Sequence, residues 1–333
     1  MTESVQTQNN RGYPIFGSKS FVYQNPSEID FAEIRKGLKE LAGDCSRAVE
    51  PAKLDFYIGP AIFEGKAAMK FFNQLFIRNV SFSPLPWAEK DSYLKYYYEI
   101  PKLVERIGMR VFPPFISVYD APLQKRYKER FLLGYYPLDA EGVIPGKVEL
   151  VRRGKLKNIY LSRHPQKNFS RSNGHGRMTA ASFPVASAGN VFIESEKTVS
   201  RKKLRQELAE LGRELELEYV VVIKDVKKYK SNSKYMGDPV SAYKIDLKTM
   251  EETPLGVMEF EGLTLRALRD IIMTDSKQEV YNFYQSGPYT YSNGRYPTSI
   301  ISPGAVLVRE IDLRKTNKKP DKLPYLKHPY LEK

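Results

Sequence analysis

The stretch from residue 54 to residue 78 constrains the fold most, because it joins an apolar strand to a helix that is apolar on all sides. The strand is expected over residues 54–63 and the helix over residues 64–78. Around the helix lie Ala67, Ala68, Phe71, Phe72, Leu75 and Phe76. Such a helix has to be buried. The rest of the chain must therefore form layers that enclose it.

Most of the remaining segments predict strands. Further strands are expected over residues 14–24, 218–224, 241–248, 256–261 and 304–313. A hairpin is expected over residues 146–161, with its turn at Arg153 and Gly154, because glycine tolerates the positive φ of a tight turn. Sequential strands with few helices favour an α+β fold. We expect an antiparallel-rich mixed sheet, or a barrel-like core, with a few packed helices.

Three further helices are expected outside the central one. Residues 28–42 place Phe31, Ile34, Leu38 and Leu41 on one face. Residues 200–216 place Leu204, Leu208, Leu211 and Leu215 on one face, beneath Ser200 as N-cap. Thr264 is expected to cap a helix that runs to about residue 273. The spacing of three and four residues predicts that each apolar face packs against the body of the protein.

Composition excludes several classes of protein. The chain has 333 residues, enough to bury a sizeable core, and a single cysteine, Cys45, so it has no internal disulfide. Cys45 is expected to be an inert structural thiol. The sequence has no apolar run of membrane-spanning length and no signal-peptide pattern near its first residue. We predict a soluble, cytoplasmic protein without membrane contact.

The net charge of +14 leaves nucleic-acid binding open but does not favour it. Lysine and arginine are scattered in short groups at residues 152–157, 201–205, 224–234 and 314–322. A nucleic-acid interface requires these side chains to gather on one surface. A solvated basic surface is the simpler interpretation.

Several sequence blocks, in order, resemble the TldD/PmbA family. They are GPAIFEGKAA (59–68), DAEGVIPGKVELVRRGKLKNIYL (139–161), SRSNGHGRM (170–178), EFEGLTLRALRDII (259–272) and ISPGAVLVREIDLRK (301–315). The resemblance implies a TldD/PmbA C-terminal-like domain over residues 51–316. Residues 1–50 are then expected to be a short strand-helix segment, either a remnant of a longer N-terminal domain or a linker from one. Residues 317–333, which are rich in proline, are expected to form an extended tail.

The resemblance also implies that the zinc ligands of the family are missing here. Zinc-bearing members carry His-Glu-x-x-x-His on the helix, and the matching positions hold Phe72, Asn73 and Ile77. The family's cysteine ligand, in a Gly-x-Cys-Gly block, has no counterpart in residues 300–315. Phenylalanine and isoleucine carry no lone pair for a metal. We therefore predict no metal, no cofactor and no catalytic residues of its own.

The loop SRSNGHGRM carries the candidate peptide-binding residues. Its glycines permit a tight turn that would expose the His175 imidazole and the Arg177 guanidinium, with Asn173 beside them. Arginine binds carboxylates with paired hydrogen bonds, so the loop is a candidate site for an extended peptide. The alternative is that the glycines only shape a connection.

Other catalytic patterns are absent from the sequence. The three histidines, His164, His175 and His328, are far apart, and there is no Gly-x-Ser-x-Gly motif and no phosphate-binding glycine motif. Asp139 and Glu141 could serve as paired carboxylates, but in a turn they more commonly bind backbone amides.

Three functions stay open at this point. The first is a noncatalytic TldD/PmbA-like subunit, of the kind that the resemblance implies, which forms a peptide-degrading dimer with a zinc-bearing paralogue or a homodimer. The aromatic segment 87–98 and the tail 320–329 are candidate partner surfaces. The second is an autonomous hydrolase that uses other residues. The third is a basic nucleic-acid-binding protein.

Overall fold

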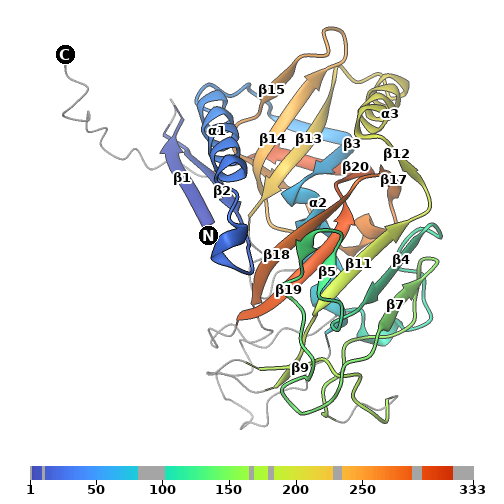
Figure 1. Cartoon of the computed structure of the whole chain (residues 1–333). Helices are drawn as coiled ribbons and strands as arrows, with labels where there is room; N and C mark the ends of the chain where they lie inside the picture. The colour runs from blue at the N-terminus through green and yellow to red at the C-terminus, as the bar shows by residue number, and fades with distance from the viewer. Residues whose placement is uncertain are drawn as a thin grey trace, which may run out of the picture.

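Two sheets and one central helix form the body of the protein (Figure 1). The description rests on a computed structural model, and the structure describes residues 2–9, 12–81, 102–164, 169–178, 184–227, 235–286 and 295–317. The helices are α1 (Phe31–Arg47), α2 (Lys66–Leu75) and α3 (Arg201–Glu214). Short 3₁₀ turns lie at Pro26–Glu28, Ile77–Val80, Val104–Arg106 and Leu265–Leu268.

The eight-stranded sheet has the order β12-β17-β20-β3-β13-β14-β15, with β16 also paired to β20. Its strands are β3 (Phe56–Glu64), β12 (Thr198–Val199), β13 (Tyr219–Val226), β14 (Pro239–Asp246), β15 (Glu252–Pro254), β16 (Met258–Phe260), β17 (Ile271–Asp275) and β20 (Ala305–Lys315). The β3–β13 and β12–β17 pairs are parallel, and the other pairs are antiparallel.

The six-stranded sheet has the order β18-β19-β11-β4-β7-β8. Its strands are β4 (Ile116–Asp120), β7 (Val148–Arg152), β8 (Lys155–Leu156), β11 (Asn190–Ser195), β18 (Gln278–Ser286) and β19 (Arg295–Pro303). Only β11–β19 is parallel. The predicted α+β fold with antiparallel-rich mixed sheets is confirmed, because most strand pairs are antiparallel and the helices are few. Both sheets are open among the described residues, so the core is not a closed barrel.

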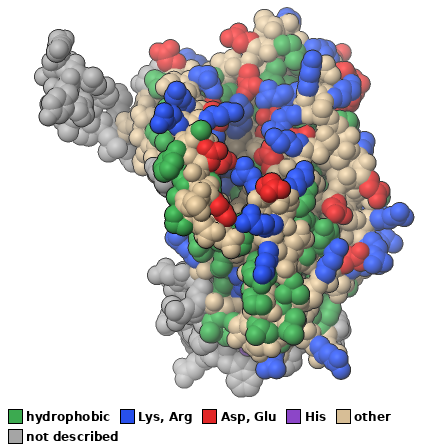
Figure 2. Space-filling model, viewed as in Figure 1, with side chains coloured by type: hydrophobic (Ala, Val, Ile, Leu, Met, Phe, Trp, Pro, Cys, Tyr) green, Lys and Arg blue, Asp and Glu red, His purple; other side chains and the backbone are tan. Residues whose placement is uncertain are grey.

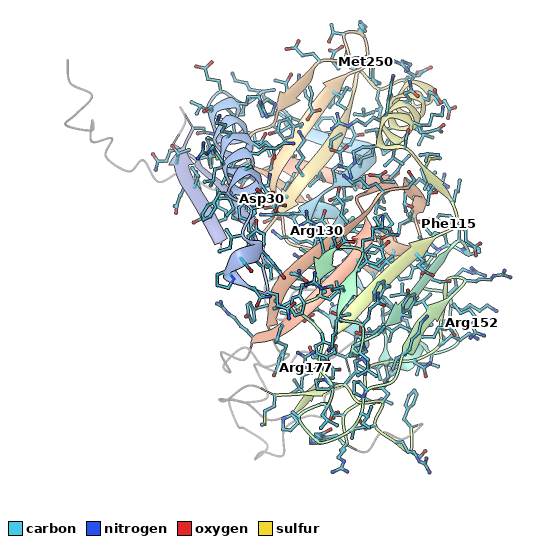
Figure 3. All side chains as sticks on the ribbon, viewed as in Figure 1. Asp30, Phe115, Arg130, Arg152, Arg177 and Met250 are labelled. Atoms are coloured by element: carbon cyan, nitrogen blue, oxygen red, sulfur yellow. The ribbon has the colours of Figure 1, made fainter. Side chains whose placement is uncertain are left out.

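Three two-stranded ribbons complete the fold. They are β1 (Thr2–Gln8) with β2 (Pro14–Ser20), β5 (Arg126–Tyr127) with β6 (Arg130–Phe131), and β9 (Gly176–Arg177) with β10 (Val185–Ala186). The β1–β2 ribbon packs with α1 beside the sheets (Figure 1). Arg130 of β6 pairs with Glu33 of α1 at 3.0 Å, near the N-cap Asp30 (Figure 3). The predicted boundary at residue 50 falls between the end of α1 and the start of β3.

Helix α2 is buried in the core that both sheets share, as its sequence predicts. The main core joins α2 to side chains of β3, β13 and β20 in one sheet and of β4, β7, β11 and β19 in the other. Phe71, Phe72 and Phe76 have no exposed surface. The helix ends at Leu75 rather than at residue 78, and a 3₁₀ turn follows.

The predicted hairpin and the Ser200 cap are confirmed. At the β7–β8 turn, Arg153 and Gly154 have φ values of 45° and 77°. A Cβ on Gly154 would lie 2.3 Å from the Phe112 carbonyl oxygen, so only glycine fits. The Ser200 hydroxyl accepts a hydrogen bond from the Lys203 backbone amide at 3.3 Å. The apolar stripe of α3 is buried at Leu204 and Leu208, whereas Leu215, at its C-terminal end, is 57% exposed.

The predicted apolar face of α1 is partly wrong. The helix begins after Asp30, whose carboxylate accepts the amides of Ala32 and Glu33. Its buried positions are Ile34, Gly37, Leu41 and Cys45, whereas Phe31 and Leu38 are exposed. The packed face is centred on Gly37, where a Cβ would lie 2.7 Å from the Phe21 ring. A small residue in the middle of a face permits this close approach, which a count of apolar residues misses.

The helix predicted from Thr264 to residue 273 is wrong beyond its first turn. The Thr264 hydroxyl accepts the Arg266 amide at 3.4 Å, but the helical segment is the single 3₁₀ turn Leu265–Leu268. Residues 271–275 form β17, which pairs with β20 in the eight-stranded sheet. Ile271 and Ile272 are β-branched, and the available sheet partner decides their conformation.

Candidate functional site

The positions that we predict to correspond to the family's metal ligands are filled mainly by core side chains. Phe72 and Ile77 have no exposed surface. The Phe72 ring centroid lies 5.6 Å from that of Phe71 and 6.2 Å from that of Phe112. Ile77 lies beyond the end of α2, in the following 3₁₀ turn. The first and last ligand positions therefore belong to the hydrophobic core.

Asn73, the middle position of the motif, is half-buried. Its Oδ1 atom is buried and has no hydrogen-bond partner among the described residues. Nor does any group of three His, Cys, Asp or Glu side chains in the described ranges come together in a way that could hold a metal ion. The chemistry of the three positions does not fit zinc, because only Asn73 offers a donor atom.

The loop of residues 170–178 lies at the end of the molecule where Figure 3 labels Arg177. The Asn173 side chain holds it in place, since it donates to the Ile159 carbonyl at 2.8 Å and accepts the Leu161 amide at 2.9 Å. Gly174 has a φ of 75°, and a Cβ there would lie 2.4 Å from Pro145. The tight turn that the glycines predict is present.

The expected exposure of the two candidate side chains is wrong. His175 is fully buried, and Arg177 is only 8% exposed. The Arg177 guanidinium donates to the carbonyls of Ala188 at 3.1 Å and Pro297 at 3.0 Å. Through these two hydrogen bonds the guanidinium ties the loop to neighbouring segments. The turn points both side chains into the protein.

A buried polar cluster surrounds His175. Its Nδ1 lies 3.1 Å from the Asn173 carbonyl oxygen, and its Nε2 lies 3.7 Å from Asp120 Oδ2. Asp120, at the end of β4, has no exposed surface. Its carboxylate accepts the backbone amides of Gly189 and Asn190, both at 2.8 Å. Asp120 therefore satisfies two buried donors and also faces the imidazole.

Two tyrosines enclose the same imidazole. The Tyr160 ring centroid lies 4.9 Å from that of His175, and the Tyr136 ring lies 6.5 Å away, edge to face. The Arg177 guanidinium lies 4.2 Å from the Tyr136 centroid. Burial raises the pKa of both tyrosines, and the negative charge of Asp120 raises it further. Both phenols are therefore harder to ionise than those of exposed tyrosines.

Asp139 and Glu141 bind backbone amides, as the sequence predicts. Asp139 accepts the amides of Glu141 at 2.9 Å, Val143 at 2.8 Å and Gly176 at 3.0 Å. Glu141 accepts the amide of Arg163 at 2.6 Å. These carboxylates therefore help to hold the loop that carries Asn173.

Sequence reasoning missed Asp120, Tyr136 and Tyr160. Each comes from a different segment, and although Tyr160 lies in the block of residues 139–161 that resembles the family, nothing there singles out its side chain, so no local signal pointed to the cluster. The exposed side chains at this end of the molecule were missed as well. They are Leu138, Ile144 and Met178, which are 54%, 69% and 50% exposed.

The match to a family model decides the affiliation of the chain. The model of the PmbA/TldA metallopeptidase C-terminal domain matches residues 58–314. The chain belongs to the PmbA/TldD family. It is therefore a peptidase-related protein. A comparison with curated proteins gave no match.

Solved structures share the PmbA/TldD fold with this chain. TldE from Thermococcus kodakarensis matches with a TM-score of 0.64 and 14% identity, over 94% of this chain and 62% of that one. A Thermotoga maritima protein described as a candidate modulator of a DNA gyrase matches with a TM-score of 0.62 and 18% identity, over 94% and 61%. The chain thus spans about three-fifths of their length. At these identities the likeness shows the fold alone.

Figure 2 bears on the alternative of nucleic-acid binding. On the face shown, lysine and arginine side chains are interspersed with aspartate and glutamate and form no single stripe. Separately, no helix in the described part of the chain is long and apolar enough to cross a membrane.

Proposed function

We propose that this chain is a noncatalytic PmbA/TldD-family subunit of a peptide-processing assembly, with a zinc-bearing paralogue as its partner. One observation carries the proposal: Phe72 and Ile77, at the first and last ligand positions, are fully buried in the core. A catalytic zinc needs several nitrogen, oxygen or sulfur ligands and an open position for water. A partner chain that carries His-Glu-x-x-x-His would supply the histidine ligands that this chain lacks.

An autonomous hydrolase is the second candidate, and the Asp120–His175 pair is the observation in its favour. A carboxylate hydrogen-bonded to an imidazole is half of a nucleophilic triad. Here the two groups lie 3.7 Å apart, and His175 Nε2 makes no hydrogen bond to the described residues. Both side chains are fully buried, however. A substrate would have to displace the packed tyrosine rings to reach them, so the structural role is the better explanation.

We retain the loop of Asn173, His175 and Arg177 as the candidate peptide-binding segment, with a changed role for its side chains. Their hydrogen bonds are made within the protein, so they shape the loop. The exposed Met178, next to Arg177, is then available for contact with an apolar peptide side chain. An extended peptide would bind by its backbone and its apolar side chains.

Affinity purification of the tagged full-length chain from its source cell tests the assembly. We expect mass spectrometry of the eluate to identify a paralogue that contains His-Glu-x-x-x-His, and the complex to cleave peptides in a zinc-dependent way. The chain purified alone is the control and should not cleave them. Purification without any such paralogue, from cells that encode one, would contradict the proposal.

A further inference from the structure

A central strand of the eight-stranded sheet exposes two large apolar side chains. Phe56 and Ile58, at the start of β3, are 70% and 52% exposed. Strand β3 lies inside the sheet, but at these two residues it pairs with β20 alone, because its register with β13 runs only from Ala61 to Phe63. Neighbouring large apolar side chains left exposed on one face are a candidate contact surface. We call Phe56 and Ile58 the β3 patch.

The β3 patch lies on the face of the sheet that α3 covers. Alternate residues of a strand point to opposite faces. Tyr57 points into the main core, whereas Ile62, which shares a face with Phe56 and Ile58, packs beneath α3. Farther along this face, Glu64 binds Arg205 of α3 through two hydrogen bonds, at 2.8 and 2.9 Å. Helix α3 ends at Glu214 and leaves the patch bare.

The chain leaves the described structure beside this patch. Arg314 of β20 pairs with Phe56, and the Lys315 amide donates to the Asp55 carbonyl at 2.8 Å. The described residues end at Asn317, with residues 318–333 still to follow. Seven residues beyond Asn317 can extend about 23 Å, whereas neighbouring strands are only about 5 Å apart. The segment is long enough to turn back over the patch.

The sequence of residues 318–333 suits binding to an apolar patch. It contains Pro-Tyr-Leu twice, at 324–326 and at 329–331. Each copy pairs a proline, which favours an extended conformation with few alternatives, with one aromatic and one aliphatic side chain. Short proline-containing segments of this type bind apolar and aromatic surfaces at low entropic cost.

The charges around the patch are complementary to the segment. Residues 318–333 contain five lysines and two carboxylates. Asp312 lies opposite Ile58 in the β3–β20 register. Asp55, Glu216 and Glu218 are exposed and lie next to β3 and β13 in sequence, and the Asp55 carboxylate is already 3.8 Å from the Lys315 ammonium nitrogen. Arg314 is already paired with Glu261 at 2.8 Å. Opposite charges around an apolar centre fix orientation more than they add affinity.

We propose that residues 318–333 dock through their Pro-Tyr-Leu repeats on the β3 patch of the same chain. One Pro-Tyr-Leu repeat has enough apolar surface to cover both Phe56 and Ile58. The second repeat raises the local concentration of the motif beside the patch. The docked segment covers the part of the sheet face that α3 leaves bare. This proposal does not depend on the presence of a catalytic partner.

Limited trypsin digestion of the full-length chain tests the docking, with cleavage after Lys322 and Lys327 as the readout. One variant carries Phe56→Thr and Ile58→Thr. A second carries serine at Tyr325, Leu326, Tyr330 and Leu331. We expect both to be cleaved about tenfold faster than the parent chain, because proteolysis follows the undocked population. The Phe56 and Ile58 changes are on exposed side chains, and circular dichroism checks that the fold is kept.

The control variant is Phe16→Thr, which removes another exposed aromatic side chain, on β2. It should be cleaved at the parental rate. Protection within one chain should not change on dilution. Equal cleavage rates in all four proteins would overturn the proposal, as would protection that is lost on dilution, which would place the segment on a second molecule.

Discussion

The triple variant Phe72→His, Asn73→Glu, Ile77→His is expected to be much less stable than the parent chain and to lack zinc-dependent peptidase activity. Phe72 and Ile77 are fully buried in the main core. Burial of a large apolar side chain stabilises a protein by roughly 1.5 to 3 kcal/mol. The loss at two positions is a large share of a total stability of about 5 to 15 kcal/mol.

Restored ligand types would still leave the metal site incomplete. The resemblance places a third, cysteine ligand of the family in residues 300–315, which contain no cysteine. The rings of Phe71 and Phe112 beside position 72 would not orient an imidazole, because they offer it no hydrogen-bond acceptor of the kind that holds a metal-bound histidine. Denaturant unfolding, zinc binding and peptide cleavage are the measurements. Phe31→His, on a side chain that is 72% exposed, is the control and should unfold like the parent. Robust zinc-dependent cleavage by the triple variant would refute this account of the motif positions.

Substitution of Asp120 by alanine is expected to be the most destabilising single change in the polar cluster. Its carboxylate accepts two buried backbone amides, those of Gly189 and Asn190. Each buried donor left without a partner costs about 1 to 3 kcal/mol. The free energy of unfolding should therefore fall by roughly 2 to 6 kcal/mol. Chemical denaturation measures the change.

Two further variants separate the hydrogen bonds from the charge. Asp120→Asn keeps one acceptor oxygen and should lie between the parent and Asp120→Ala. Asp55→Ala removes an aspartate whose side chain is 86% exposed and should stay within about 0.5 kcal/mol of the parent. Parental stability of Asp120→Ala would show that the carboxylate does not hold the amides of residues 189 and 190.

The sequence predicted those parts of the fold that local chemistry determines. The apolar helix after β3, the Arg153–Gly154 turn and the Ser200 cap each follow from residues close together in the chain. The segment 271–275 did not, because its pairing with β20 overrides the continuation of the Thr264 turn. The face of α1 did not either, because it is set by the fit of Phe21 against Gly37.

The candidate site was predictable only where one segment contains it. Asp139 was expected to bind amides, and it accepts three. Asp120 and Tyr160 meet His175 only after the chain has folded, and nothing in their own segments indicates it. The direction of the His175 side chain depends on a turn fixed by the distant Ile159 carbonyl, so its burial could not be derived from the glycines. The predicted segments 87–98 and 320–329 lie outside the described residues.

The zinc content of the purified full-length chain, measured by elemental analysis after extensive dialysis, tests the central claim most directly. The claim is that core side chains have replaced the metal ligands of the family. It predicts far less than one zinc per chain and no cleavage of peptides by the chain alone. A content of about one zinc per chain, retained through dialysis, would contradict it, because a structural or catalytic zinc site needs three or four ligands.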